Sequence, residues 1–323
     1  MNYRTIGKTD VSVSEVSLGC WTMGGLNWVD GKANGWANVD EDDITTAIKT
    51  AIDGGVTHFD NADVYGNGRA ERMLARILKK LGLQSTDFVI ASKMGHFKGT
   101  GEHAYHPLNI RHQCEQSLLN LDREYIDIYY FHHGDFGPWL EEAAATMREL
   151  VKEGKVRAVG QSAYSAADFE RAVPVVRPDV LQSWAHGLDD QFIREGSPVN
   201  QLLEKHSMSF VAFSPLAQGL MLDKFDPANP PKFEEGDHRQ ANDKFHTEFL
   251  SQLKPKLARL KQRFGDTTED LSAMAQRYIL NHSHVACTIP GFRNERQVKC
   301  NLAAAKSSLS FEDMKFIRDT LSE

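Results

Sequence analysis

Two side chains capable of proton transfer lie five positions apart within residues 58–68. Asp60 ends an apolar, β-branched run, and Tyr65 lies in the Gly- and Asn-rich segment that follows. This pattern predicts a strand that ends at Asp60 and a loop that turns Tyr65 back over that end. In parallel α/β proteins the carboxyl ends of the strands form the functional face. We therefore expect Asp60 and Tyr65 to share one rim, with partners supplied by other strands.

Polar side chains also end the other segments that are predicted to be strands. Lys93 ends the third such strand and His132 follows the fourth. Because parallel strands present their carboxyl ends at the same face, we expect these groups to converge on one pocket. Further polar residues at or just beyond strand ends are His133, Ser162, Gln182, Ser214 and Arg293.

Asp60, Tyr65, Lys93 and His132 together could deliver a proton to a carbonyl. A phenol with a pKa near 10 is a poor acid at neutral pH. An ammonium group beside it favours phenolate, so Lys93 is predicted to lower the pKa of Tyr65, with Asp60 as its counter-charge. A neutral His132 could orient and polarise the carbonyl. No side chain can donate hydride, so a cofactor must supply it.

Each of these residues also has an ordinary structural interpretation. Alone, Asp60 could cap a turn, Lys93 could extend along the rim to solvent, and His132 could be a core histidine. The phenol of Tyr65 could simply be solvated. Four such groups predicted at one rim favour the catalytic interpretation.

Strand-like and helical segments alternate along almost the whole chain. A helical stripe such as Ile44, Ala47, Ile48 and Ala51 separates each strand from the next. The alternation predicts one (β/α)8 TIM barrel over residues 1–323, with an N-terminal hairpin within 1–14 and C-terminal helices at 294–305 and 311–321. The eight strand-like runs are 16–18, 56–60, 88–93, 125–131, 156–160, 180–182, 210–213 and 285–289. The polar stretch with Trp28 and Trp36 and residues 217–246 are predicted as loops.

A doubly wound open sheet is the competing architecture. It would need a glycine fingerprint after its first strand. The sequence Gly66-Asn67-Gly68-Arg69-Ala70-Glu71 stops short of GxGxxG, so the barrel is favoured.

Composition excludes some classes of function. The net charge of -7 argues against a nucleic-acid-binding surface, although a local cationic pocket for a phosphorylated ligand remains open. No stretch approaches the length of a membrane span. The four cysteines lack CxxC spacing, which favours a reduced, cytoplasmic protein over a disulfide or zinc scaffold. Composition leaves the oligomeric state open.

The segments HFDNADVYGNG, VIASK and YIDIYYFH, which carry Asp60, Tyr65, Lys93 and His132, resemble the catalytic tetrad segments of the aldo-keto reductases. The resemblance extends from SLGCWTMGG to TIPGFRNERQVKCN. It implies a (β/α)8 barrel that binds an extended nicotinamide cofactor, usually NADPH rather than NADH, and acts on a small carbonyl substrate. It also implies that Tyr65 is the general acid, that Lys93 and Asp60 tune it, and that His132 orients the substrate.

The resemblance assigns further residues to the cofactor. Cys20, Trp21, Asp60, Ser162, Gln182 and Phe213 would lie at the nicotinamide end, with Phe213 stacking on the ring. Ser214, Leu216, Gln218 and Lys224 would contact the pyrophosphate. Gly291, Arg293, Gln297 and Asn301 would surround the adenosine end, with Arg293 at a 2′-phosphate. Trp28 and His133 are expected to line the substrate pocket beside Tyr65 and His132.

Three positions depart from the family pattern. Ala163 replaces an Asn that often contacts the carboxamide, Ala185 replaces a Tyr, and Cys300 replaces a Glu that contacts adenine. These departures affect the expected cofactor geometry and leave the tetrad intact.

Two other chemistries fit less well. A metal hydrolase would need more ligands than His58 and Asp60 provide, and Lys93 would oppose the metal charge, so no metal is expected. Gly160-Gln161-Ser162-Ala163-Tyr164 lacks the last glycine of a nucleophile elbow. A barrel that binds cofactor to regulate a partner protein, as channel-associated members of the family do, remains the alternative function.

Overall fold

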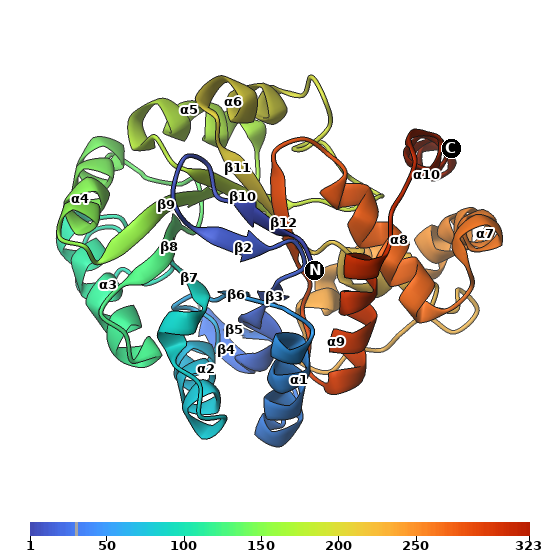
Figure 1. Ribbon diagram of the computed structural model, residues 1–323, viewed down its shortest axis with the longest axis horizontal. Coiled ribbons are helices and arrows are strands. Elements are labelled where there is room, and N and C mark those ends of the chain that lie inside the picture. Colours follow the sequence, from blue (N-terminus) through green and yellow to red (C-terminus); the bar gives the residue numbers. More distant parts are fainter. Residues whose placement is uncertain (30–31) are drawn as a thin grey trace.

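The computed structural model describes residues 1–29 and 32–323. Eight parallel strands form its central sheet, and helices surround them as an outer ring (Figure 1). The predicted (β/α)8 barrel is therefore confirmed. In sheet order the strands are β12 (Val285–Ile289), β11 (Ser209–Phe213), β10 (Val180–Trp184), β9 (Val156–Ser162), β8 (Ile126–Phe131), β7 (Val89–Met94), β6 (His58–Asp60) and β3 (Leu18–Gly19).

Short parallel bridges complete the ring between its first and last strands. Val16 pairs with Thr288, and Gly19 pairs with Gly291. The amides of Ser17 and Gly19 donate to the carbonyls of Thr288 and Pro290 at 2.9 and 3.1 Å. This closure joins the first strand of the barrel, β3, to the last, β12.

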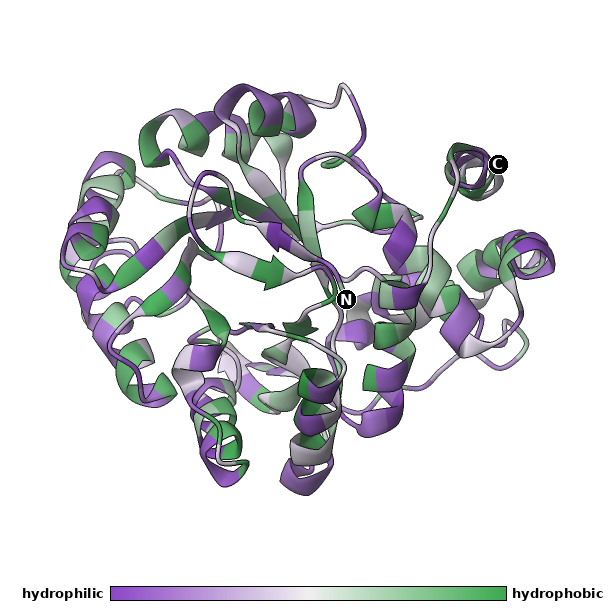
Figure 2. Ribbon diagram, in the orientation of Figure 1, coloured by the Kyte–Doolittle hydropathy of each residue, from purple (hydrophilic) through white to green (hydrophobic). Residues whose placement is uncertain are grey.

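Helices connect the strands in the expected alternation. They are α1 (Glu41–Asp53), α2 (Arg69–Lys80), α3 (Pro107–Leu121), α4 (Leu140–Lys152), α5 (Ala166–Val176), α6 (Pro198–His206), α7 (Thr247–Phe264), α8 (Thr268–Leu280), α9 (Glu295–Leu302) and α10 (Phe311–Ser322). Asp40 caps α1, because its side chain accepts from the amides of Asp42 and Asp43. Figure 2 shows hydrophobic and hydrophilic residues alternating along these helices, as expected for helices with one buried stripe.

An antiparallel hairpin of β1 (Tyr3–Thr5) and β2 (Ser12–Ser14) lies across the middle of the ring (Figure 1). Its apolar residues Ile6, Val11 and Val13 pack into a buried cluster with strand residues such as Ile128 and Val211. The hairpin therefore fills the amino-terminal end of the barrel. The carboxyl-terminal end is left as the face where side chains from different strands meet.

The prediction of a loop around Trp28 and Trp36 was wrong in part. This stretch forms a second hairpin, β4 (Leu26–Val29) with β5 (Lys32–Gly35). Its polar composition hid the pairing, because a hairpin outside the barrel has little apolar alternation. The Asp30-Gly31 dipeptide is the sequence signal that could have indicated it. Residues 217–246 lack long elements but contain short 3-10 helices: η3 (Ala217–Leu222), η4 (His238–Ala241) and η5 (Asp243–Phe245).

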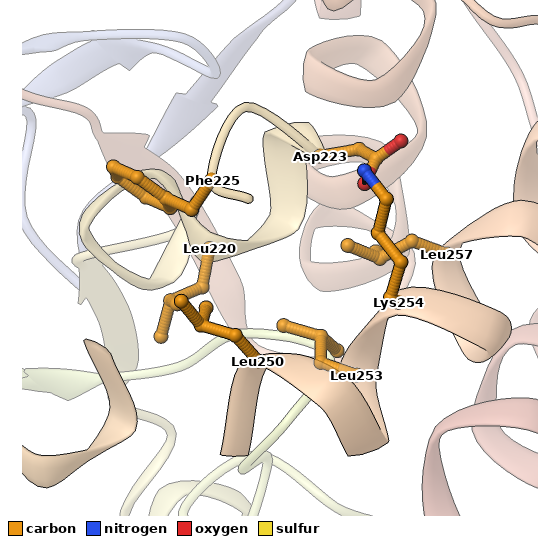
Figure 3. Close-up of a pocket in the computed structure, with 7 residues that line it drawn as sticks. All are labelled: Leu220, Asp223, Phe225, Leu250, Leu253, Lys254 and Leu257. Carbon is orange, nitrogen blue, oxygen red and sulfur yellow. Dashed lines mark hydrogen bonds and ion pairs between the residues drawn. The ribbon is translucent and has the colours of Figure 1, made fainter. Parts of the chain in front are cut away.

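A small cavity of about 10 Å³ lies between η3 and α7, near Leu220 and Leu253 (Figure 3). Its rim carries Asp223, which is paired with Lys254 at 2.8 Å and Lys261 at 2.9 Å. Space for about one water molecule among leucines makes this a packing void rather than a ligand site. Each helix among the described residues is either too short or too polar to span a lipid bilayer.

Candidate active site

Lys93 lies at the centre of the polar groups in the barrel mouth. Its ammonium Nζ forms an ion pair with the Asp60 carboxylate, and both side chains are 1% exposed. It also donates to the Asn61 carbonyl at 2.8 Å and to the Tyr65 hydroxyl at 3.4 Å. Neighbouring strands place these groups, since β6 pairs Asp60 with Ala91 two residues before Lys93 on β7. One buried ammonium therefore joins the carboxylate to the phenol.

His132 approaches Tyr65 from the end of β8. Its amide donates to the Met94 carbonyl at 2.9 Å, and its ring lies 5.9 Å from the Tyr65 ring, edge to face. Burial, followed by the nearby charges of His96 and Lys93, holds the pKa of His132 well below its usual value. The ring is therefore neutral near pH 7, and no described residue hydrogen-bonds its Nδ1. The structure thus brings Asp60, Tyr65, Lys93 and His132 together.

The predicted lowering of the Tyr65 pKa is not found in the protein without ligands. Burial raises the pKa of Tyr65 well above 10, and the negative charge of Asp60 raises it further. The sequence argument weighed the ammonium alone, whereas the structure pairs that ammonium with a carboxylate that cancels much of its field. Tyr65 therefore holds its proton firmly until a group that can accept it comes into contact.

An aromatic surface covers the phenol. Trp21, in η1 (Cys20–Met23), stacks on Tyr65 at 6.1 Å and meets the edges of Trp36 at 5.8 Å and His238 at 4.8 Å. The β4/β5 hairpin reaches the same region, because the Gly35 amide donates to the Gly236 carbonyl at 3.1 Å. Sequence reasoning missed His238, since nothing in residues 217–246 indicates which of them returns to the mouth.

Two residues predicted to line the substrate pocket are placed differently. Trp28 is 66% exposed on the hairpin, and no ring contact joins it to Tyr65 in the described part of the chain. Both ring nitrogens of His133 are engaged, with Nε2 at 2.7 Å from the Gly95 carbonyl and Nδ1 accepting from the Asp135 amide at 3.2 Å. His133 therefore shapes a loop instead of offering a free polar atom. His96 takes the place beside His132, with ring centroids 4.6 Å apart.

Residues predicted for the nicotinamide lie beside the tetrad. Ser162 and Gln182 are register partners on β9 and β10, and both are 1% exposed. The Ser162 hydroxyl has no hydrogen-bond partner among the described residues, whereas Gln182 donates to the Asp60 carboxylate at 2.8 Å. Phe213 is half-buried between Tyr164 at 6.3 Å and Trp184 at 6.5 Å. Cys20 is fully buried nearby.

The segment predicted to hold phosphates has an unusual backbone. Ser214, Ala217 and Gln218 have φ of 52°, 46° and 56°, and Leu216 precedes η3. Two amides of this turn are already used, since Ala217 donates to the Ser214 carbonyl and Gly219 to the Leu216 carbonyl, each at 2.8 Å. The buried carbonyl oxygen of the Gln218 side chain has no partner in the described structure.

Lys224 adds positive charge to this segment. Burial, followed by the charges of Arg239, Arg296 and Arg293, lowers the pKa of Lys224. Like charges gathered around an ammonium are unfavourable without an anion, so this cluster fits a phosphate-bearing ligand. Arg239 was not predicted; it packs on Trp36 at 4.7 Å and on Phe233 at 4.2 Å.

The predicted adenosine end is held by hydrogen bonds at the start of α9. The Arg293 amide donates to the Gln297 side chain at 2.7 Å, and Asn301 donates to the Gly291 carbonyl at 3.3 Å. The Arg293 guanidinium lies 5.9 Å from the Trp36 ring and donates to the Ala37 carbonyl at 3.3 Å.

The positions that depart from the family pattern differ in their surroundings. Ala163 and Ala185 are fully buried and offer no polar side-chain atom. Cys300 donates to the Glu269 carboxylate at 3.0 Å, so an acid from α8 lies beside the position where the family pattern has Glu. The sequence could not show this, because Glu269 is 31 residues away. The described residues hold no cluster of three or more His, Cys, Asp or Glu suited to a metal ion.

Comparison with known proteins agrees with the barrel and its polar mouth. The model of the Aldo/keto reductase family matches residues 15–321. The chain is 31% identical to "Uncharacterized oxidoreductase Mb2320" of Mycobacterium bovis, over 95% of this chain and 89% of that one. It is 26% identical to "Probable voltage-gated potassium channel subunit beta" of Arabidopsis thaliana, over 94% and 91%. It resembles the structure of the glycerol dehydrogenase AKR11B4 from Gluconobacter oxydans with a TM-score of 0.82 and 26% identity, over 99% and 95% of the two chains.

The protein therefore belongs to the aldo/keto reductase family. Membership makes it an oxidoreductase that uses a nicotinamide nucleotide and acts on small carbonyl compounds.

Proposed function

We propose that this protein reduces an aldehyde or ketone with NADPH, with Tyr65 as the general acid. The main support for this proposal is the contact between the Lys93 ammonium and the Tyr65 hydroxyl at 3.4 Å. As a proton leaves Tyr65 for the carbonyl oxygen, negative charge develops on the phenol oxygen. A buried ammonium already held beside that oxygen stabilises the charge without reorganisation of solvent.

Asp60 and Gln182 keep the ammonium in place. Asp60 neutralises Lys93 in the buried site, and Gln182 donates to the second carboxylate oxygen at 2.8 Å, which fixes the carboxylate. His132 is neutral and partly covers the space beside Tyr65, so its ring can donate a hydrogen bond to a carbonyl oxygen there. Trp21 stacks on Tyr65 and limits the access of water to the phenol.

The residues around the mouth fit a nicotinamide dinucleotide phosphate. The unpartnered hydroxyl of Ser162 suits a carboxamide, and the cations around Lys224 suit a pyrophosphate. Arg293 suits a 2′-phosphate because it forms no ion pair with a carboxylate of the described residues, and Glu295 is instead paired with Lys299 at 2.9 Å. When bound, NADPH supplies the hydride that no side chain can provide.

A direct test mixes the protein with NADPH and 4-nitrobenzaldehyde and follows NADPH absorbance by stopped flow. We expect multiple turnovers in the parent protein and a large loss in Tyr65→Phe, with NADPH binding retained. An equal rate in the two proteins would contradict the role of Tyr65.

A second function, regulation of a partner by the bound cofactor, is favoured by the likeness to the potassium channel subunit beta. The same experiment separates the two functions. A pure regulator would bind NADPH tightly and turn over no aldehyde in the parent protein.

A further inference from the structure

A second pocket opens between α2 and α3, helices that pack side by side in the outer ring (Figure 1). Its volume is about 340 Å³, within the range of roughly 300–1,000 Å³ for small-molecule sites. None of the four residues of the tetrad lines it. It is lined by Asp63, Asn67, Gly68, Arg72, Phe97, Gln113, Gln116 and Asn120.

Asp63 is the unusual residue in this pocket. It is 4% exposed, and neither of its carboxyl oxygens has a hydrogen-bond partner among the described residues. Buried polar groups without partners are rare in folded proteins and call for an occupant or a function. The neighbouring acid Glu71 differs, because Asn120 at 2.8 Å and Ser92 both donate to it.

The protonation of Asp63 indicates what the pocket can recognise. Burial, and then the charge of Glu71, raise the pKa of Asp63 well above its ordinary value. This favours the neutral carboxyl, which offers one donor and one acceptor. The side-chain amides of Asn67 and Gln113 can offer the same pairing, and a hydroxyl group needs both. The Asn120 amide is already engaged, since it donates to Glu71 and accepts from Arg72 and Gln116.

The charges in the pocket disfavour an ionic ligand of either sign. Arg72 would repel a cation, and Glu71, whose charge also acts on Asp63, would repel an anion. Phe97 adds an apolar surface against which the C–H face of a sugar ring can pack.

We propose that this pocket binds an uncharged, polyhydroxylated small molecule about the size of a monosaccharide. The inference is independent of the reductase function, since its lining excludes the tetrad. It adds one consequence for the active site: Asp63, Asn67 and Gly68 belong to the same loop as Tyr65, and the Asp63 amide donates to the Lys93 carbonyl at 3.0 Å. Occupancy is therefore expected to order the loop that carries the phenol.

The test titrates D-sorbitol, which has no carbonyl, into the protein without cofactor and follows binding by saturation-transfer NMR. We expect saturable binding. Asp63→Ala and Gln113→Ala should each weaken it at least about tenfold, the effect expected for loss of a hydrogen bond at a buried group. Asp63→Asn should bind within about threefold of the parent, because a carboxamide also donates and accepts. Gln262→Ala, at an exposed glutamine of α7, is the control and should bind like the parent.

Hydrogen exchange locates the site. Sorbitol should slow exchange in residues 61–73 and 113–120. Slower exchange only around Trp21 and His132 would mean that sorbitol occupies the active site, and the proposal would be wrong. It would equally be wrong if no saturable binding occurs, if Asp63→Ala and Gln113→Ala bind normally, or if spermidine or inorganic phosphate displaces sorbitol. Because Gln113 lies on a different element from Asp63, a misfolded Asp63→Ala does not leave the proposal untested.

Discussion

Removing the Lys93 ammonium gives the sharpest test of the proposed mechanism. In Lys93→Met, Tyr65 loses the positive charge at 3.4 Å that would stabilise a developing phenolate. Two unit charges at that distance interact by about 5 kcal/mol with an effective dielectric constant near 20, which is an upper limit of roughly 10³- to 10⁴-fold in rate. Asp60, paired with the same ammonium, offsets part of this. We therefore expect kcat/KM for aldehyde reduction to fall by about 10²- to 10³-fold.

Lys93→Met also leaves Asp60 as a buried charge without its partner, which by itself costs roughly 3–5 kcal/mol of stability. The double variant Lys93→Met with Asp60→Asn removes the stranded charge and is expected to recover stability in a urea titration. It should not recover the rate. Lys79→Met, at an exposed lysine of α2, is the matched control and should keep full activity.

The assay is steady-state reduction of 4-nitrobenzaldehyde at saturating NADPH, with NADPH affinity measured separately by fluorescence. A folded Lys93→Met protein with kcat/KM within about threefold of the parent would refute the electrostatic argument, because so small a change is under 1 kcal/mol. Recovery of the rate by the double variant would also refute it. The loss in Lys93→Met would then reflect disorder of the site rather than a missing charge.

Three further outcomes follow from the geometry. Tyr65→Phe should lower the reduction rate at least ~10²-fold, the scale for loss of a general acid, with unchanged NADPH affinity by fluorescence titration. Burial lowers the pKa of His58 to about 4, so the unfolded chain takes up its proton first as pH falls. Stability should therefore decline by up to ~3 kcal/mol from pH 6.5 to 4, and His58→Met should flatten that decline in urea titrations at each pH. Arg293→Ala should remove a preference for NADPH over NADH of roughly 10- to 150-fold, measured as a ratio of Kd values, whereas Lys299→Ala should retain it.

The local pattern of the sequence was enough for the fold and for the placement of the tetrad. Alternating strand and helix signals predicted the barrel, because hydrophobic periodicity records which face of each element is buried. Parallel strands then place their carboxyl ends at one face, so the sequence alone was enough to expect Asp60, Lys93 and His132 close together. The spacing of five residues from Asp60 to Tyr65 is short enough for a loop to return the phenol to its own strand.

Only the tertiary structure decided the contacts and the electrostatic environment of these side chains. The contact of Gln182 with Asp60 joins residues 122 apart, and the stacking of Trp21 on Tyr65 depends on the path of a 3-10 helix. Neither leaves a periodic signal in the sequence. The pKa of Tyr65 moved opposite to expectation because it depends on burial and on every nearby charge at once. Residue types and spacing identify the side chains that take part. The net electrostatic effect of the neighbouring charges on each of them depends on distances that exist only after the barrel closes.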